Sequence, residues 1–113
     1  MHELGITQEI VEILSLRANE LQPNARIKRV VLEIGKLSAV LPDAIRFCFD
    51  LCTEGTPVEG ASLQILEPQG QARCRLCKSE MLFEQPFGEC VCGGIDLEWL
   101  SGGELRIKEM ELE

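Results

Sequence analysis

Hydrophobic positions along the chain predict two helices. From Leu4 to Leu21, apolar residues recur at every third or fourth position, which is typical of a helix with one buried face. Pro42 is a residue that favours a first helical turn, and a second helix is expected to begin there. The apolar seam of that helix consists of Ile45, Cys48, Phe49 and Cys52.

Alternating apolar and polar residues predict three strands, at residues 26–37, 62–67 and 104–112. The alternation in the last segment changes phase near Lys108-Glu109, so we expect a β-bulge there. The sequence contains no internal repeat. The predicted fold class is therefore α+β, with one small three-stranded sheet and two helices.

Residues 73–94 contain four of the six cysteines but too few large apolar residues to form a core. We interpret this part of the chain as an insertion between two strands of the sheet. The expected organisation is an α/β domain formed by residues 1–70 plus 102–113, and a ribbon domain formed by residues 71–101.

Composition and charge disfavour several classes of protein. A length of 113 residues allows one core with a small satellite, and a net charge of -8 disfavours nucleic acid as a partner. No apolar run is long enough to span a membrane, and no leader pattern precedes the first helix, so we expect a cytoplasmic protein. In a reducing compartment, close-set cysteines more often bind metal or do redox chemistry than form structural disulfides.

The cysteine spacing predicts a zinc ribbon. Cys74, Cys77, Cys90 and Cys92 form a C-x-x-C and a C-x-C pair. Four thiolates on two turns can surround a tetrahedral zinc ion, and such a closed site is structural rather than catalytic. A redox disulfide, an iron–sulfur site and unliganded thiols remain alternatives at this point. By contrast, Cys48 and Cys52 lie in the apolar seam of the second helix, where packing is the expected role.

The amino terminus offers a second set of metal ligands. The amine of Met1 and the amide and imidazole nitrogens of His2 can form fused chelate rings around one ion, and Glu3 can add a further ligand atom. Nitrogen-rich, nearly planar ligand sets suit Ni(II) or Cu(II). The alternative is that this histidine, the only one in the chain, is a solvated residue at a fraying end.

Four motifs occur in order along the chain: the opening Met1-His2-Glu3-Leu4, the segment Glu33-Ile34-Gly35-Lys36-Leu37-Ser38, the cysteine segment and the closing Ser101-Gly102-Gly103-Glu104-Leu105-Arg106-Ile107. Together they resemble the HypA/HybF family of nickel metallochaperones for [NiFe]-hydrogenase maturation. The resemblance covers the whole chain in order.

The resemblance implies transient Ni(II) binding through Met1 and His2, with Glu3 as a neighbouring or direct ligand, and a structural Zn(II) in the ribbon. It also implies a nickel-binding α/β domain with an inserted zinc domain. The implied partners are a HypB-type GTPase and the hydrogenase large subunit. The resemblance also implies that, in some bacteria, family members take part in the maturation of urease. The chain itself has no phosphate-binding loop, so nucleotide hydrolysis is expected to belong to a partner.

The second cysteine pair departs from the family pattern. Family members typically carry C-x-x-C followed by glycine, which would place a cysteine at position 89, where this chain has Glu89. Either Cys90 binds zinc in a tighter turn, or Glu89 supplies an oxygen ligand. We expect Cys90 to be the ligand.

Three function classes can be compared on these observations. The leading hypothesis is a nickel metallochaperone with a structural zinc site. The alternative is a zinc-ribbon protein-interaction module without nickel transfer, in which His2 has no role. An enzyme is not expected, because the chain has a single histidine and no nucleophile–base constellation.

Overall fold

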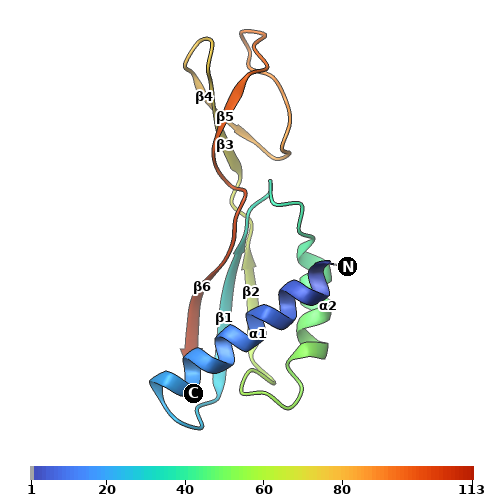
Figure 1. Cartoon of the computed structure of the whole chain (residues 1–113), viewed down its shortest axis with the longest axis vertical. Coiled ribbons are helices and arrows are strands. Elements are labelled where there is room, and N and C mark those ends of the chain that lie inside the picture. The colour runs from blue at the N-terminus through green and yellow to red at the C-terminus, as the bar shows by residue number, and fades with distance from the viewer. Residues whose placement is uncertain (1) are drawn as a thin grey trace. The chain divides into compact units, whose positions relative to one another are not determined.

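The computed structural model describes residues 2–113 and contains two helices and six strands in that range (Figure 1). The element order is α1 (His2–Leu21), β1 (Ile27–Ile34), α2 (Pro42–Cys52), β2 (Ser62–Leu66), β3 (Gly70–Cys74), β4 (Glu80–Phe83), β5 (Leu97–Ser101) and β6 (Leu105–Leu112). The strands form two three-stranded sheets, with orders β2-β1-β6 and β4-β3-β5. Among the described residues, no helix is both long and apolar enough to cross a membrane.

The described chain divides into two compact units. The first contains the chain up to Leu32, Val40–Ile65 and Ile107–Glu113, and the second contains Glu33–Ala39 and Leu66–Arg106. Both helices belong to the first unit, and all four ribbon cysteines belong to the second.

In the first unit, α1 packs against α2 and lies across the strands (Figure 1). The inward face of α1 buries Thr7, Ile10, Val11, Leu14 and Ala18, which are spaced as the sequence pattern predicts. The centre of this core is formed by side chains that are at most 1% exposed: Leu14, Ala18, Ile27, Val30, Leu32, Ile45 and Val58.

The predicted α+β fold is confirmed, and its element limits are close to the observed ones. The first strand ends at Ile34 rather than at residue 37, because the backbone leaves the strand and enters a turn after Gly35. Burial along β6 changes phase at Lys108-Glu109, where both residues are exposed. The helix α2 begins at Pro42, where the lost backbone N–H costs no helical hydrogen bond.

The second unit has a small antiparallel sheet, with β3 between β4 and β5. Its buried cluster consists of Ala72, Cys74, Cys90 and Leu97, with Met81 and Phe83 packed against it. Half of the fully buried members are therefore cysteines. Apolar burial here is small, as the composition predicts, so the unit needs a further source of stability.

Two of the family-like motifs meet inside the second unit. The N–H of Gly35 donates to the carbonyl of Glu104, and that of Leu37 donates to the carbonyl of Gly102, both at 2.9 Å. A Cβ at Gly35 would lie 2.0 Å from the Gly102 carbonyl oxygen, and Gly102 itself has a φ of 95°. Both positions therefore require glycine for steric reasons. The side chains of Glu33 and Arg106, which belong to the same two motifs, form an ion pair.

Candidate metal centre

The first cysteine pair lies on a tight turn after β3. The N–H of Lys78 donates to the carbonyl of Cys74 and the N–H of Cys74 donates to the carbonyl of Ser79, each at 2.8 Å. The N–H of Cys77 points at Cys74 Sγ, 3.5 Å away. Lys78 has a φ of 70°, so the turn uses the left-handed conformation even without glycine.

The second cysteine pair lies on a turn between β4 and β5. The N–H of Cys90 donates to the carbonyl of Gly94 at 2.9 Å, and the N–H of Gly93 donates to the carbonyl of Cys90 at 2.8 Å. Gly93 supplies the positive φ, 91°, that this turn requires. The two turns are joined by a hydrogen bond from the Arg75 N–H to the Asp96 carbonyl and by the ion pair between their side chains, at 3.2 Å.

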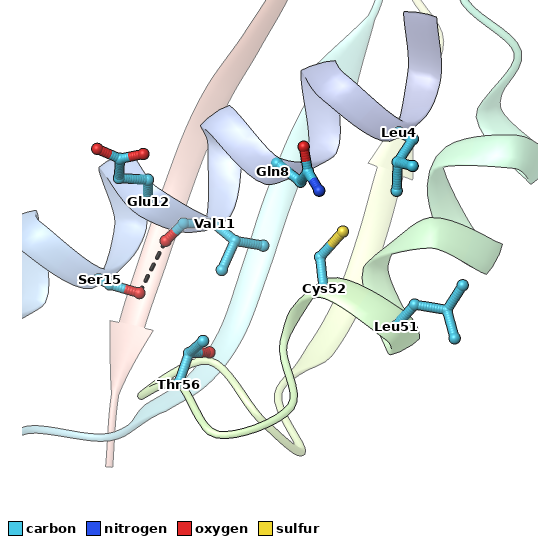
Figure 2. Close-up of a pocket in the computed structure, with 8 residues that line it drawn as sticks. All are labelled: Leu4, Gln8, Val11, Glu12, Ser15, Leu51, Cys52 and Thr56. Carbon is cyan, nitrogen blue, oxygen red and sulfur yellow. Dashed lines mark hydrogen bonds between the residues drawn. The ribbon is translucent and has the colours of Figure 1, made fainter. Parts of the chain in front are cut away.

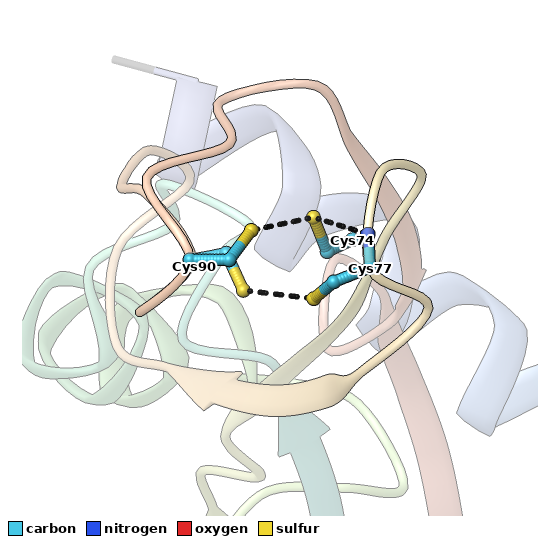
Figure 3. Close-up of side chains that lie close together, drawn as sticks. Cys74, Cys77 and Cys90 are labelled. Carbon is cyan, nitrogen blue, oxygen red and sulfur yellow. Dashed lines mark hydrogen bonds between the residues drawn. The ribbon is translucent and has the colours of Figure 1, made fainter.

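The four sulfur atoms converge at one point, as the view of the cluster shows (Figure 3). Cys74 and Cys92 Sγ are 3.7 Å apart, Cys77 and Cys90 Sγ are 3.4 Å apart, and all four lie within 4.8 Å of one another. Sulfurs placed tetrahedrally around zinc at ~2.3 Å would be separated by ~3.8 Å. The observed spacing fits that geometry and is too long for disulfides, and all four thiols are free.

The tighter C-x-C pair does not prevent this convergence. Cys90 is buried, and its sulfur lies next to that of Cys77, while the sulfur of Cys92 lies next to that of Cys74. Glu89 is exposed and does not belong to the group of side chains that could hold a metal ion. Of the two alternatives for the second pair, the geometry favours Cys90.

Gly94 lies against two of the four sulfur atoms, and the sequence analysis did not predict this role. A Cβ at this position would lie 3.0 Å from Cys74 Sγ and 3.4 Å from Cys92 Sγ. A side chain at this position would require the sulfurs to shift by a few tenths of an ångström. The sequence signal for this role was the pair Gly93-Gly94. Only Gly93 has a positive φ, so the backbone angle does not explain the glycine at position 94.

The thiols differ in how readily they ionise. The side chain and N–H of Ser79 lower the pKa of Cys77 to about 6. At Cys92, the N–H of Gly94 lowers the pKa, but the Cys90 and Cys77 thiols and burial outweigh it and raise the pKa to about 12. Four neighbouring thiols resist full ionisation unless a cation is bound between them, so this cluster is suited to couple metal binding to proton release.

Of the predicted nickel ligands, Met1 lies outside the described residues. His2 is the first described residue of α1 and is exposed, and Glu3 is half-buried in the same turn. Glu3 Oε2 accepts the backbone N–H of Leu41 at 3.2 Å, which ties the start of α1 to the residue that precedes α2. The Glu3 N–H and the Leu41 N–H together lower the pKa of this carboxyl. The described residues do not bring a third metal-binding side chain to His2 and Glu3.

The other two cysteines are half-buried on α2, less deeply than their seam position suggests. Cys52 lines a cavity of about 420 Å³ between α1 and the end of α2 (Figure 2). Burial and the neighbouring Cys48 raise the pKa of the Cys52 thiol. Neither cysteine belongs to the group of described side chains that could hold a metal ion, and packing stays the expected role of this pair.

Comparisons with known proteins agree with these features. A family model described as "Hydrogenase/urease nickel incorporation, metallochaperone, hypA" matches residues 1–112. This chain belongs to the HypA family. HypA proteins are metallochaperones, that is, maturation factors rather than enzymes, so the expectation of a non-enzyme is confirmed.

The relatives match the chain over its full length. A protein of Trichormus variabilis named "Hydrogenase maturation factor HypA" is 57% identical over 113 residues, which cover 100% of this chain and 96% of that protein. One of the same name from Geotalea uraniireducens is 47% identical and is covered completely.

The fold of the HypA chain also matches solved structures. The solution structure of the Ni metallochaperone HypA from Helicobacter pylori has a TM-score of 0.67 at 23% identity, covering 97% of this chain and 96% of that one. A second solution structure, of a HypA protein, has a TM-score of 0.70 at 23% identity, with 100% and 97% coverage. At this identity the likeness establishes the fold.

Proposed function

We propose that this chain binds Ni(II) at its amino terminus and delivers it during maturation of [NiFe]-hydrogenase, while a structural zinc holds the ribbon. The observation that carries the proposal is membership of a nickel-incorporation family across residues 1–112, which includes the candidate ligands His2 and Glu3. In this proposal Met1 provides the amine, His2 the amide and imidazole nitrogens, and Glu3 a neighbouring or direct oxygen.

Exposure of the ligands supports transient binding. His2 is exposed and lies at the first turn of α1, so a receiving protein can reach an ion held there. Glu3 follows directly in the same turn and is held near the start of α2 by the Leu41 N–H, which donates to one oxygen of its carboxylate. Cargo bound by such a site can be removed one ligand at a time, unlike an ion in a closed sulfur cage.

The second metal site is proposed to be Zn(II) bound by Cys74, Cys77, Cys90 and Cys92. When bound, zinc supplies a cross-link between the two turns, which compensates for the small apolar cluster of the second unit. The cysteines orient their sulfurs through the turn hydrogen bonds, and Gly94 leaves room for them. We propose a cytoplasmic location for the protein, because these thiols must stay reduced to bind metal.

The proposed partners are a HypB-type GTPase and the hydrogenase large subunit, and urease maturation proteins where the organism has them. We further propose that residues 1–70 plus 102–113 act as the nickel-binding domain and residues 71–101 as the zinc domain. The nickel ligands are then separated in the chain from the zinc ligands.

Calorimetric titration with Ni(II) tests the proposal. Zinc-loaded protein with a native amino terminus is compared with His2→Ala and with a protein that carries one added residue before Met1. Both changes should weaken nickel binding at least about tenfold, since each removes a nitrogen from the chelate. The helical circular dichroism should not change, because His2 is exposed.

A matched pair of glutamates on α1 tests the third ligand. Glu3→Gln is compared with Glu9→Gln, which makes the same change at an exposed carboxylate farther along α1. Weaker nickel binding in Glu3→Gln alone would support a role for Glu3. Equal nickel affinities in the native protein and His2→Ala would contradict the proposal and favour a zinc-ribbon interaction module.

A further inference from the structure

A pocket of about 380 Å³ lies in the second unit, and two motifs that the metal sites leave unexplained contribute to it. One motif is the segment at residues 33–38, and the other is the closing segment at residues 101–107. The lining residues are Leu37, Pro86, Trp99, Leu100, Ser101, Gly103 and Glu104, and we call this site the Trp99 pocket. Its volume is in the range typical of ligand-binding pockets.

A register shift in the small sheet directs two large side chains of β5 to the Trp99 pocket. Trp99 lies opposite Ala72 of β3, and Ser101 lies opposite Gln71, so Leu100 is an extra residue in β5. In a regular strand, Trp99 and Leu100 would point to opposite faces. An extra residue re-aims a side chain, and here both residues line the same pocket. The bulge therefore gives one pocket an aromatic and an aliphatic wall.

The Trp99 ring is held in place and remains accessible. It packs edge to face against the ring of Phe83, with the ring centroids 5.2 Å apart and an interplanar angle of 66°. Trp99 is nevertheless 41% exposed, so part of its side chain is open to a ligand. Among aromatic side chains, the indole ring attracts cations most strongly. An indole held in this way therefore favours a positively charged ligand.

Glu104 adds a negative charge to the same pocket. Its side chain is exposed, and it lines the pocket together with Trp99. The hydrogen bond and the charge of Glu33 raise the pKa of Arg106, and the charge of Glu104 adds to this more weakly. Arg106 therefore pairs with Glu33 in preference to Glu104. The Glu104 carboxylate is consequently able to accept hydrogen bonds from a cationic ligand.

The surface beside the pocket favours a protein as the source of this cation. Leu100 is 37% exposed, and Phe87, which follows the lining residue Pro86 in the chain, is 66% exposed. Exposed apolar side chains next to polar ones are typical of surfaces that bind proteins. The net charge of -8 on the whole chain also attracts a basic partner.

We propose that the Trp99 pocket binds an arginine side chain in a basic segment of a partner protein. The guanidinium lies against the Trp99 ring and donates hydrogen bonds to the Glu104 carboxylate, while the methylene groups of the arginine contact Leu37 and Leu100. Arginine fits better than lysine, because a planar guanidinium stacks on an aromatic ring and reaches a carboxylate through two N–H groups. The inference is independent of nickel delivery, since no lining residue is a proposed metal ligand.

Fluorescence titration of the zinc-loaded protein with a capped peptide of sequence Gly-Leu-Arg-Leu-Gly tests the proposal. Trp99 is the only tryptophan, so its emission should change and saturate as the peptide binds. The same peptide with glutamine in place of arginine should bind about tenfold more weakly, because it loses the charge-assisted hydrogen bonds and the cation–π contact. Amide shifts in NMR spectra should be largest at Trp99 and Leu100.

A matched pair of variants tests the carboxylate. Glu104→Gln should weaken binding of the arginine peptide about tenfold and leave binding of the glutamine peptide unchanged. Glu67→Gln makes the same change at an exposed carboxylate of the same unit outside the pocket and should have no effect. Zinc content and the emission spectrum without peptide show whether both variants fold.

Several outcomes would overturn the proposal. Equal affinities for the two peptides would assign the pocket to an apolar ligand. A change in Trp99 emission with protein concentration alone would assign it to a second copy of the chain. The absence of saturable binding, equal behaviour of Glu104→Gln and Glu67→Gln, or NMR shifts confined to other residues would show that the pocket does not bind arginine.

Discussion

At the scale of single residues, the cysteine cluster depends on positions that are not themselves ligands. Ser79 lowers the pKa of Cys77, and the Arg75–Asp96 pair joins the two turns. Gly94 leaves space for two of the sulfurs. Metal affinity in this chain should therefore respond to changes beside the cysteines as well as to changes of the cysteines.

Gly94→Ala should weaken zinc binding by roughly 10–100-fold, the range typical for residues that position metal ligands. The added Cβ would lie 3.0 Å from Cys74 Sγ, so the sulfur must move. Gly103→Ala is the control, because a Cβ there meets nothing within 4 Å. Competition with a chromophoric chelator measures both affinities. Equal affinities would show that the sulfurs adapt and that Gly94 has no part in the site.

At the scale of elements, α1 is stabilised by one face only. Leu14 is 1% exposed and belongs to the buried core, whereas Leu16, on the same helix, is 62% exposed. The helix brings His2 and Glu3 to one end, so its packing also places the proposed nickel ligands. Its stability should depend strongly on the inward side chains and weakly on the outward ones.

Leu14→Ala should lower the free energy of unfolding by about 3 kcal/mol, because it removes apolar contacts and leaves a cavity. Leu16→Ala makes the same chemical change on the exposed side and should alter this free energy by less than about 0.5 kcal/mol. Urea denaturation of the zinc-loaded proteins, followed by circular dichroism at one protein concentration, measures both values. Similar losses in the two variants would contradict the observed orientation of α1.

At the scale of the whole molecule, the two units differ in what stabilises them. The first unit has a core of large aliphatic side chains that includes Leu14, Leu32 and Ile45. The second has two cysteines among its four buried cluster residues. Metal binding should therefore be a condition for folding of the second unit only.

Removal of zinc by a chelator should unfold the ribbon and leave the helices intact. Trp99, the only tryptophan, lies in β5 with its ring 5.2 Å from that of Phe83, so its fluorescence reports on the second unit. Both helices lie in the first unit, so circular dichroism at helical wavelengths reports on that one. Fluorescence should change on chelation while the helical signal persists. A joint loss of both signals would mean that the first unit also depends on the metal.

The elements and the cluster of four cysteines could be predicted from local information. Helix and strand periodicity depends on neighbouring residues, so the limits of α1 and α2 and the phase change in β6 follow from the sequence pattern. The four cysteines were predicted because close-set thiols on turns have few other uses in a reducing compartment. The role of Gly94 was not predicted, because it depends on a sulfur twenty residues earlier in the chain.

The sequence by itself determined the fold class, the family and the four cysteines that could hold a metal ion, because periodicity and cysteine spacing are local features. Only the tertiary structure decided which distant residues meet. It paired Gly35 with Gly102 and Glu3 with the N–H of Leu41, and it left β6 at a free sheet edge. Such contacts depend on how strands are ordered and how turns close, and no single segment of the chain contains that information.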